Sequence, residues 1–152
     1  MSRDRLNIHG AIDLQTGQTM IKDVLTVDAV NTIMLLMAIE AAFPAKRLLH
    51  VFVDNARYHH AKLVQAWLAR PGCRIRLHFV PASCPHLNPI ERLWGLMHGH
   101  ITHNKCYATF RKFSAAMLNF LRENVPRNWP AYCDQVTDNF RVNDPTEFRI
   151  IA

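Results

Sequence analysis

The sequence predicts a single domain of the α/β class, and three observations lead to this prediction. Segments with the apolar pattern of strands alternate along the chain with segments that have the pattern of helices. No stretch rich in Pro, Gly or Ser divides the 152 residues into parts. With 49% hydrophobic residues, the chain is long enough to bury a core of its own.

The first two predicted strands form a hairpin. They cover residues 6–12 and 19–27, and residues 13–18 between them include Asp13 and Gly17, which are residue types typical of turns. We expect the two strands to pair antiparallel. A helix should follow, with Asp28 as its N-cap and Pro44 behind its end. Because residues 29–43 are apolar on nearly every face, we expect this helix to be buried.

The remaining elements continue the alternation. Strands are predicted over residues 48–53 and 74–80, and a helix over residues 57–69 lies between them, ended by Pro71 and Gly72. Two more helices are predicted over residues 89–100 and 109–123. Residues 126–152 form a tail with little clear periodicity.

Two acidic residues stand at the ends of predicted elements. Asp54 follows the apolar strand 48–53, at the strand end where open α/β sheets place ligands. Glu91 lies in the first turn of the helix that begins after Asn88. Hard divalent cations prefer carboxylate ligands, so the two acids suggest a metal site. A structural alternative is open for both, because Asp54 or Asn55 would serve as an N-cap, and Asn88 with Glu91 would serve as a capping box.

The charge and cysteine content narrow the class of partner and the compartment. Eighteen Lys and Arg against twelve Asp and Glu favour a polyanionic partner, although solubility alone would explain a charge of +6. Four cysteines without a C-x-x-C spacing are typical of free thiols in a reducing compartment. The start lacks the apolar core of a signal peptide, and the longest apolar run, residues 33–39, is too short to span a bilayer. We therefore expect a cytoplasmic protein without a membrane partner.

Three motifs occur in a specific order. Residues 53–59 read Val-Asp-Asn-Ala-Arg-Tyr-His, residues 80–81 read Val-Pro, and residues 85–94 read Pro-His-Leu-Asn-Pro-Ile-Glu-Arg-Leu-Trp. In this order and spacing they resemble the catalytic domain of mariner-type DDE transposases, in particular those of related bacterial insertion sequences. The likeness covers most of residues 5–125. It implies an RNase H-like fold, a five-stranded mixed sheet flanked by helices, over residues 1–125, with residues 126–152 as a tail that packs on this domain or extends it.

The resemblance also implies a function. The family cleaves transposon ends and joins them to target DNA, so the implied partner is DNA and the implied location is the nucleoid. Asp54 and Glu91 match the second and third acids of the family's catalytic triad and would hold Mg²⁺ or Mn²⁺, two ions in the complete site. Two such ions a few ångströms apart stabilise the attacking and departing oxygens of phosphoryl transfer. The residues of the motifs that would support them are Asn55, His59, Asn88 and Pro89.

The first acid of the triad has no counterpart. In the family it lies on a central strand before the hairpin, and only residues 1–4 precede the hairpin here, so we expect this strand to be missing and its neighbours to be left with unpaired edges. Asp13 is a candidate substitute, but its place in the turn favours a structural role. We expect the chain to be inactive alone and to need an N-terminal transposase fragment in trans or a homo-oligomer. The alternative is a non-catalytic remnant that binds DNA or another transposase subunit.

Basic residues near the motifs are candidate phosphate contacts, with ordinary surface solvation as the alternative for each. They are Arg57, Lys62, Arg92, Lys105, Arg111 and Lys112. A further group, His98, His100, His103 and Cys106, has the ligand types of a zinc site, but its spacing matches no standard finger. A solvated or DNA-facing helix is therefore the favoured interpretation of this group.

Overall fold

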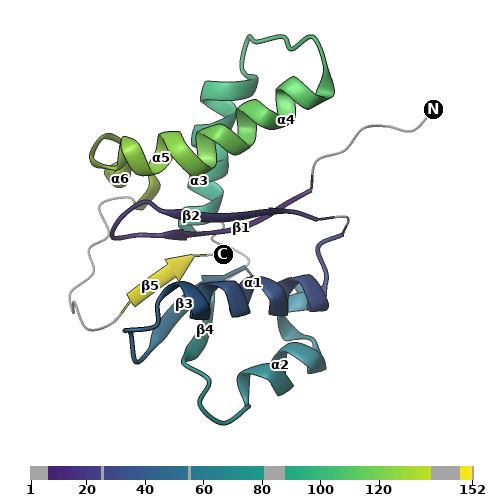
Figure 1. Ribbon diagram of the computed structural model, residues 1–152, viewed down its shortest axis with the longest axis vertical. Coiled ribbons are helices and arrows are strands. Elements are labelled where there is room, and N and C mark those ends of the chain that lie inside the picture. Colours follow the sequence, from purple (N-terminus) through teal and green to yellow (C-terminus); the bar gives the residue numbers. More distant parts are fainter. Residues whose placement is uncertain (1–6, 25, 55, 81–87, 138–147, 152) are drawn as a thin grey trace.

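A computed structural model describes residues 7–24, 26–54, 56–80, 88–137 and 148–151. Five strands form one mixed sheet in the order β2-β1-β5-β3-β4, and helices lie on both of its faces (Figure 1). The predicted α/β class and the mixed sheet flanked by helices are confirmed.

The hairpin is formed by β1 (Ile8–Asp13) and β2 (Thr19–Asp23), which pair antiparallel as predicted. Asp13 closes it: its amide donates to the Gln18 carbonyl at 2.8 Å, and its Oδ1 accepts from the Gln15 amide at 2.8 Å. Gly17 completes the turn with a φ of 74°, a left-handed conformation that residues with a Cβ rarely adopt. The structural role expected for Asp13 is confirmed.

The other half of the sheet holds β3 (Leu49–Val53) and β4 (Ile75–Phe79), which pair parallel. Between β1 and β3 lies β5 (Phe148–Ile151), antiparallel to β1 and parallel to β3. We expected the centre of the sheet to be empty, and this expectation is wrong, because the backbone of β5 gives both neighbours a partner. A strand ahead of the hairpin would fall on residues 1–6, which lie outside the described residues.

The helix after the hairpin is α1 (Ala29–Ala42), and the Asn31 amide donates to Oδ1 of its N-cap Asp28 at 2.9 Å. One face packs on the sheet through fully or almost fully buried residues: Thr32, Leu35, Leu36 and Ile39. The opposite face is about half exposed at Val30 (56%), Met34 (48%) and Met37 (54%). The expected burial of this helix is therefore wrong for one face, because α1 lies on the outside of the domain.

The segment predicted as one helix over residues 57–69 is two elements. A 3₁₀ turn, η1 (Arg57–His60), is followed by α2 (Lys62–Leu68), and Ala61 between them is extended, with φ −59° and ψ 146°. Val64 of α2 is fully buried and joins the core formed by α1, β3 and β4. Helices α1 and α2 thus share one side of the sheet (Figure 1).

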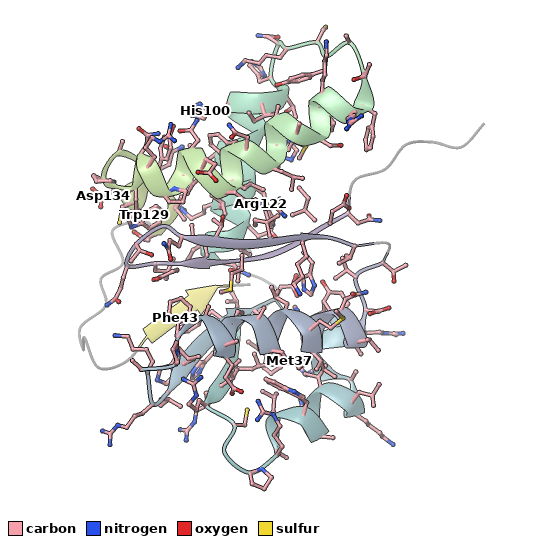
Figure 2. All side chains as sticks on the ribbon, in the orientation of Figure 1. Met37, Phe43, His100, Arg122, Trp129 and Asp134 are labelled. Carbon is pink, nitrogen blue, oxygen red and sulfur yellow. The ribbon has the colours of Figure 1, made fainter. Side chains whose placement is uncertain are left out.

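The helices on the other side of the sheet come from residues 89–137. They are α3 (Pro89–Met97), the π-helical turn η3 (His98–Thr102), α4 (Phe110–Asn119), the π-helical turn η4 (Phe120–Asn124), α5 (Val125–Arg127) and α6 (Trp129–Thr137). Their core includes Leu93, Phe120, Leu121 and Val136, packed on Ile12 of β1. Trp129, labelled in Figure 2, lies against the hairpin turn, where a Cβ on Gly17 would be 2.5 Å from its ring. The predicted tail therefore contributes both helices and a strand.

Candidate metal centre

Asp54 stands directly after β3, and its side chain is half exposed (49%). Its Oδ1 accepts hydrogen bonds from the Ala56 amide and from Nδ1 of His59, both at 3.0 Å. Within the described residues, the second carboxylate oxygen makes no hydrogen bond. Asp54 thus closes the turn that leads into η1 and still presents one oxygen to a ligand. Asn55, the alternative cap, lies outside the described residues.

His59 is buried, and its Nδ1 also lies 3.0 Å from the backbone carbonyl oxygen of Asp54. Burial lowers the pKa of His59, and the hydrogen bonds and charge of Asp54 oppose this effect. Burial thus favours the neutral form of the ring. The two oxygens beside Nδ1 assign its single proton to that nitrogen, since both can only accept. His59 donates this proton to Asp54 and fixes the direction of its carboxylate.

Glu91 is exposed in the first turn of α3. Asn88 caps that helix: its buried side chain accepts from the Ile90 amide at 3.3 Å, and Pro89 occupies the first helical position. The Glu91 carboxylate makes no hydrogen bond to any described residue, so the reciprocal half of the capping box is not formed. The cap leaves this carboxylate available to a ligand.

Tyr58 links the two acids electrostatically. Burial raises the pKa of Tyr58 most, and the negative charges of Asp54 and Glu91 raise it further. Because both charges act on one phenol, Asp54 and Glu91 lie within electrostatic range of the same side chain. The sequence analysis did not single out Tyr58.

His9 of β1 was also missed. It is buried, its ring meets Tyr58 edge to face with centroids 6.4 Å apart, and its Nδ1 makes no hydrogen bond to a described residue. The pKa of His9 is lowered to about 4, first by burial and then by the charge of His59, and the charges of Asp28 and Asp54 act against this. His9, Tyr58 and His59 therefore form a neutral aromatic cluster next to Asp54. The only sequence signal for it was the alternation along β1, which places His9 on the same face as the core residue Ala11.

A second histidine pair lies on the sheet itself. Nδ1 of His50 on β3 is 2.7 Å from Nε2 of His78 on β4, and Phe52 stacks on His78 with ring centroids 4.9 Å apart. Residues 50 and 52 point to the same face of β3, and Phe52 is opposite His78 in β4, so these three rings share a face of the sheet. One ring must accept the hydrogen bond, which requires at least one neutral imidazole. The sequence analysis missed this pair because β3 and β4 are separated by a helix in the chain.

No described group of three or more His, Cys, Asp or Glu side chains is arranged to hold a metal ion. Asp13 does not join Asp54, because it lies two strands away from β3: Asp13 is opposite Ile150 of β5, and Ile150 is opposite Val51, three residues before Asp54. Both carboxylate oxygens of Asp13 are hydrogen-bonded within the turn, by Gln15 and Thr16. Among the residues that the structure describes, the carboxylates available at the candidate centre are thus Asp54 and Glu91.

The candidate phosphate contacts do not form one surface. Arg57 and Lys62 are exposed just after Asp54, on η1 and α2. Lys105, Arg111 and Lys112 are exposed around the start of α4, and the connection from α3 to α4 lies at the other end of the long axis from α2 (Figure 1). Nε of Arg92 donates to the Gln135 carbonyl of α6 at 2.8 Å, so this side chain connects two helices.

The histidines after α3 are exposed and do not converge on a metal. His98 contacts Thr102 one turn later, with its Nδ1 3.2 Å from the hydroxyl. His100, labelled in Figure 2, stacks on Phe120 with ring centroids 5.2 Å apart. These contacts agree with the solvated helix favoured above.

Comparison with known proteins decides the family. The sequence model of the family described as DDE superfamily endonuclease matches residues 1–114, three-quarters of the chain. The chain belongs to this family. The resemblance to DDE transposases stated from the three motifs is confirmed, and both Asp54 and Glu91 lie in the matched region.

A relative of this DDE superfamily endonuclease is the insertion element IS630 uncharacterized 39 kDa protein of Shigella sonnei, which is 27% identical over 94 residues. That alignment covers 62% of this chain and 27% of the relative, so the chain spans only part of the relative's length. No solved structure matches. Among the described residues of this endonuclease family member, no helix has the length and apolar character needed to cross a membrane.

Proposed function

We propose that this chain carries the catalytic core of a transposase, a metal-dependent endonuclease and strand transferase that acts on insertion-sequence DNA. The observation that supports this most is the pair Asp54 and Glu91: each presents carboxylate oxygen without a hydrogen-bond partner among the described residues, and both act on Tyr58. The family match and the insertion-element relative support the reaction class.

The proposed fold is RNase H-like. Its support is the sheet itself: an antiparallel hairpin, β1 and β2, sits beside three mutually parallel strands, β5, β3 and β4, with helices on both faces. Asp54 ends a strand in the parallel half, which is the edge where such sheets bind ligands.

The donor set at this edge suits Mg²⁺ or Mn²⁺. Both donors are carboxylate oxygens, which hard cations prefer, and Asp54 is held in one direction by His59. When bound, such ions supply charge stabilisation for the attacking and departing oxygens of a phosphodiester. The protein's own contribution is to orient Asp54 through His59 and Ala56 and Glu91 through the Asn88 cap. Arg57, exposed three residues after Asp54, would contact a neighbouring phosphate.

We further propose that the chain alone does not complete the site. Within the described part of the chain two carboxylates, Asp54 and Glu91, are available there, and β5, the neighbour of β3 at the centre of the sheet, has the sequence Phe-Arg-Ile-Ile and brings no acid. A third carboxylate would then come from an N-terminal transposase fragment in trans or from a second copy. The same observation favours the second candidate function, a non-catalytic module that binds DNA or another transposase subunit.

A nicking assay on insertion-sequence end DNA with Mg²⁺ tests both proposals. We expect no nicking by the 152-residue chain, and nicking when an N-terminal transposase fragment that carries the first acid is supplied, fused or in trans. The restored activity should disappear in Glu91→Gln and persist in Asp13→Asn. Nicking by the short chain that depends on Glu91 would refute its incompleteness. Restored nicking that is indifferent to Glu91→Gln and Asp54→Asn would refute the metal centre.

A further inference from the structure

A stacked pair of aromatic rings lies at the carboxyl end of the parallel strands. His60 of η1 and Phe79 of β4 have ring centroids 4.1 Å apart and ring planes within 12° of each other. His60 is exposed, and Phe79 is 38% exposed. Phe79 belongs to neither of the two cores that the described residues form, so core packing does not account for its aromatic ring. We call these two residues the ring pair.

Backbone contacts fix the ring pair next to Asp54. In the parallel pairing of β3 with β4, Phe79 lies opposite Val53, the residue before Asp54, and the Val80 amide donates to the Val53 carbonyl at 2.8 Å. The other ring belongs to the η1 turn, whose His59 donates to the Asp54 carboxylate. Because paired strands are only about 4.8 Å apart, the ring pair stands beside the candidate metal centre.

The segment that carries the ring pair is basic. Between Asp54 and Glu91 the sequence contains five Lys and Arg residues and no Asp or Glu. Two of these bases, Arg57 and Lys62, are exposed, and they lie three residues before His60 and two residues after it. The surface therefore favours a polyanionic partner, whose phosphates the two bases can contact.

Exposed aromatic rings among basic residues are typical of surfaces that bind single-stranded nucleic acid. Every nucleobase has a face that stacks on an aromatic ring, while Lys and Arg bind the backbone. In a continuous duplex each base is already stacked between its neighbours, so only an unpaired or extruded base offers its face to a protein ring. An apolar segment of a protein partner would also cover the rings, but it would leave the surplus of bases unused.

We propose that the ring pair is a stacking platform for an unpaired nucleobase of the DNA strand that enters the candidate centre. The base lies on the ring pair, the phosphate beside it faces Asp54 and Glu91, and Arg57 and Lys62 hold neighbouring phosphates. The proposal rests on the proposed function, because it takes DNA as the substrate at Asp54. It adds a substrate preference to that function: unpaired DNA next to the scissile phosphate is bound more tightly than continuous duplex.

Fluorescence anisotropy in EDTA tests the preference with the full 152-residue chain. The probes are a duplex with a short single-stranded overhang and a blunt duplex with the same number of phosphates. We expect the overhang DNA to bind about tenfold more tightly, because one base gains a stacking partner. Phe79→Leu, which keeps an apolar side chain but removes the ring, should abolish this preference, and Phe79→Tyr should retain it. The matched control is Phe110→Leu, a 36% exposed Phe on α4, on the other side of the sheet, which should retain it too.

A second measurement changes the DNA and leaves the protein as it is. The fluorescent base aminopurine, whose emission falls when it stacks, is placed at each overhang position in turn. The wild-type chain should quench it at one position, and an abasic site at that position should weaken binding about tenfold. Equal affinity for overhang, abasic and blunt DNA would overturn the proposal. A preference for the overhang that persists in Phe79→Leu would also overturn it.

The two proposals fail separately, because both binding measurements are made without a divalent metal. Nicking that depends on Glu91, together with equal affinity for overhang and blunt DNA, would overturn the stacking platform and leave the proposed function standing. Quenching that depends on Phe79, in a chain that does not nick even when the N-terminal fragment is supplied, would support the platform and count against the proposed function alone.

Discussion

At the scale of single residues, the candidate centre depends on how His59 holds Asp54. The imidazole donates one proton, from Nδ1, and the Asp54 carboxylate oxygen and carbonyl oxygen lie together at 3.0 Å from it. A ligand carboxylate that is fixed in this way loses less rotational freedom when a cation binds. The second interaction shell of a metal site commonly contributes ten- to a hundredfold to metal affinity.

We therefore expect His59→Ala to weaken Mn²⁺ binding about tenfold, with part of the affinity recovered in His59→Asn, whose amide can donate to Asp54. Calorimetric titration of Mn²⁺ measures this. Lys62→Ala, a change at an exposed residue on the adjacent helix, is the control and should bind as the wild type does. Equal affinity of wild type and His59→Ala would show that His59 serves the fold alone.

His9 makes stability depend on pH. Its pKa is about 4 in the folded protein against an ordinary value of 6.5, so the unfolded chain binds the proton more readily. The stabilisation by neutral His9 is complete above about pH 6.5 and is lost as the pH falls toward 4. We expect the free energy of unfolding to drop by about 1–3 kcal/mol across this window because of His9.

Urea unfolding of wild type and His9→Gln between pH 7 and 4.5 isolates this contribution. The variant should be less stable at pH 7 and should show a flatter pH dependence, and the difference in slope is the quantity to compare. His59 changes stability in the same direction, because burial lowers its pKa too, and it remains in both proteins. Parallel curves for the two proteins would contradict the assigned role of His9.

At the scale of elements, the contact between the hairpin turn and α6 joins the first and last parts of the domain. Gly17 and Gly72 both have a left-handed backbone, with φ of 74° and 78°. They differ in surroundings: a Cβ on Gly17 would meet the Trp129 ring at 2.5 Å, while a Cβ on Gly72 meets nothing within 4 Å. The pair therefore separates the cost of the backbone conformation from the cost of crowding.

Gly72→Ala should destabilise the protein by about 1 kcal/mol, the cost of the backbone conformation alone. Gly17→Ala should destabilise the protein by about 1–3 kcal/mol more than Gly72→Ala does, because the Trp129 ring must move. Chemical denaturation of both variants against wild type measures the difference. Equal destabilisation would mean that Trp129 yields without cost and that this contact contributes little.

At the scale of the whole molecule, the excess of basic residues should govern DNA binding. The exposed candidates lie in two groups, Arg57 with Lys62 and Lys105 with Arg111 and Lys112, at separate ends of the domain. A short duplex cannot be assumed to touch both groups. Binding experiments can count the phosphates that are neutralised, since each contributes about 0.9 to the slope of log K against log[salt] on duplex DNA.

We expect the affinity for duplex DNA to fall steeply with salt, so that the slope of log K against log[salt] is about −2 or more negative. The preference for particular DNA sequences should be weak. If Arg57 and Lys62 contact the phosphates near Asp54, the double change to Ala should reduce the slope by about 2, and Arg111→Ala with Lys112→Ala should reduce it less. Fluorescence anisotropy at several salt concentrations gives these slopes. A flat salt dependence would refute the electrostatic account of binding.

Local sequence signals determined much of this protein. The hairpin, the caps Asp28 and Asn88, and the strand that ends at Asp54 could all be predicted, because turn residues, capping side chains and apolar periodicity act between neighbours in the chain. The motifs around Asp54 and Glu91 likewise predicted the family, which the comparison confirms.

What only the tertiary structure decided depends on contacts between distant segments. The place of β5 at the centre of the sheet follows from unpaired strand edges that attract any compatible strand, whatever its position in the chain. The exposed face of α1 follows from the layer in which that helix lies, since an apolar sequence is the same whether or not a partner covers it. The cluster of His9, Tyr58 and His59 forms because β1 and η1 meet in space, and no periodicity along either segment records that meeting.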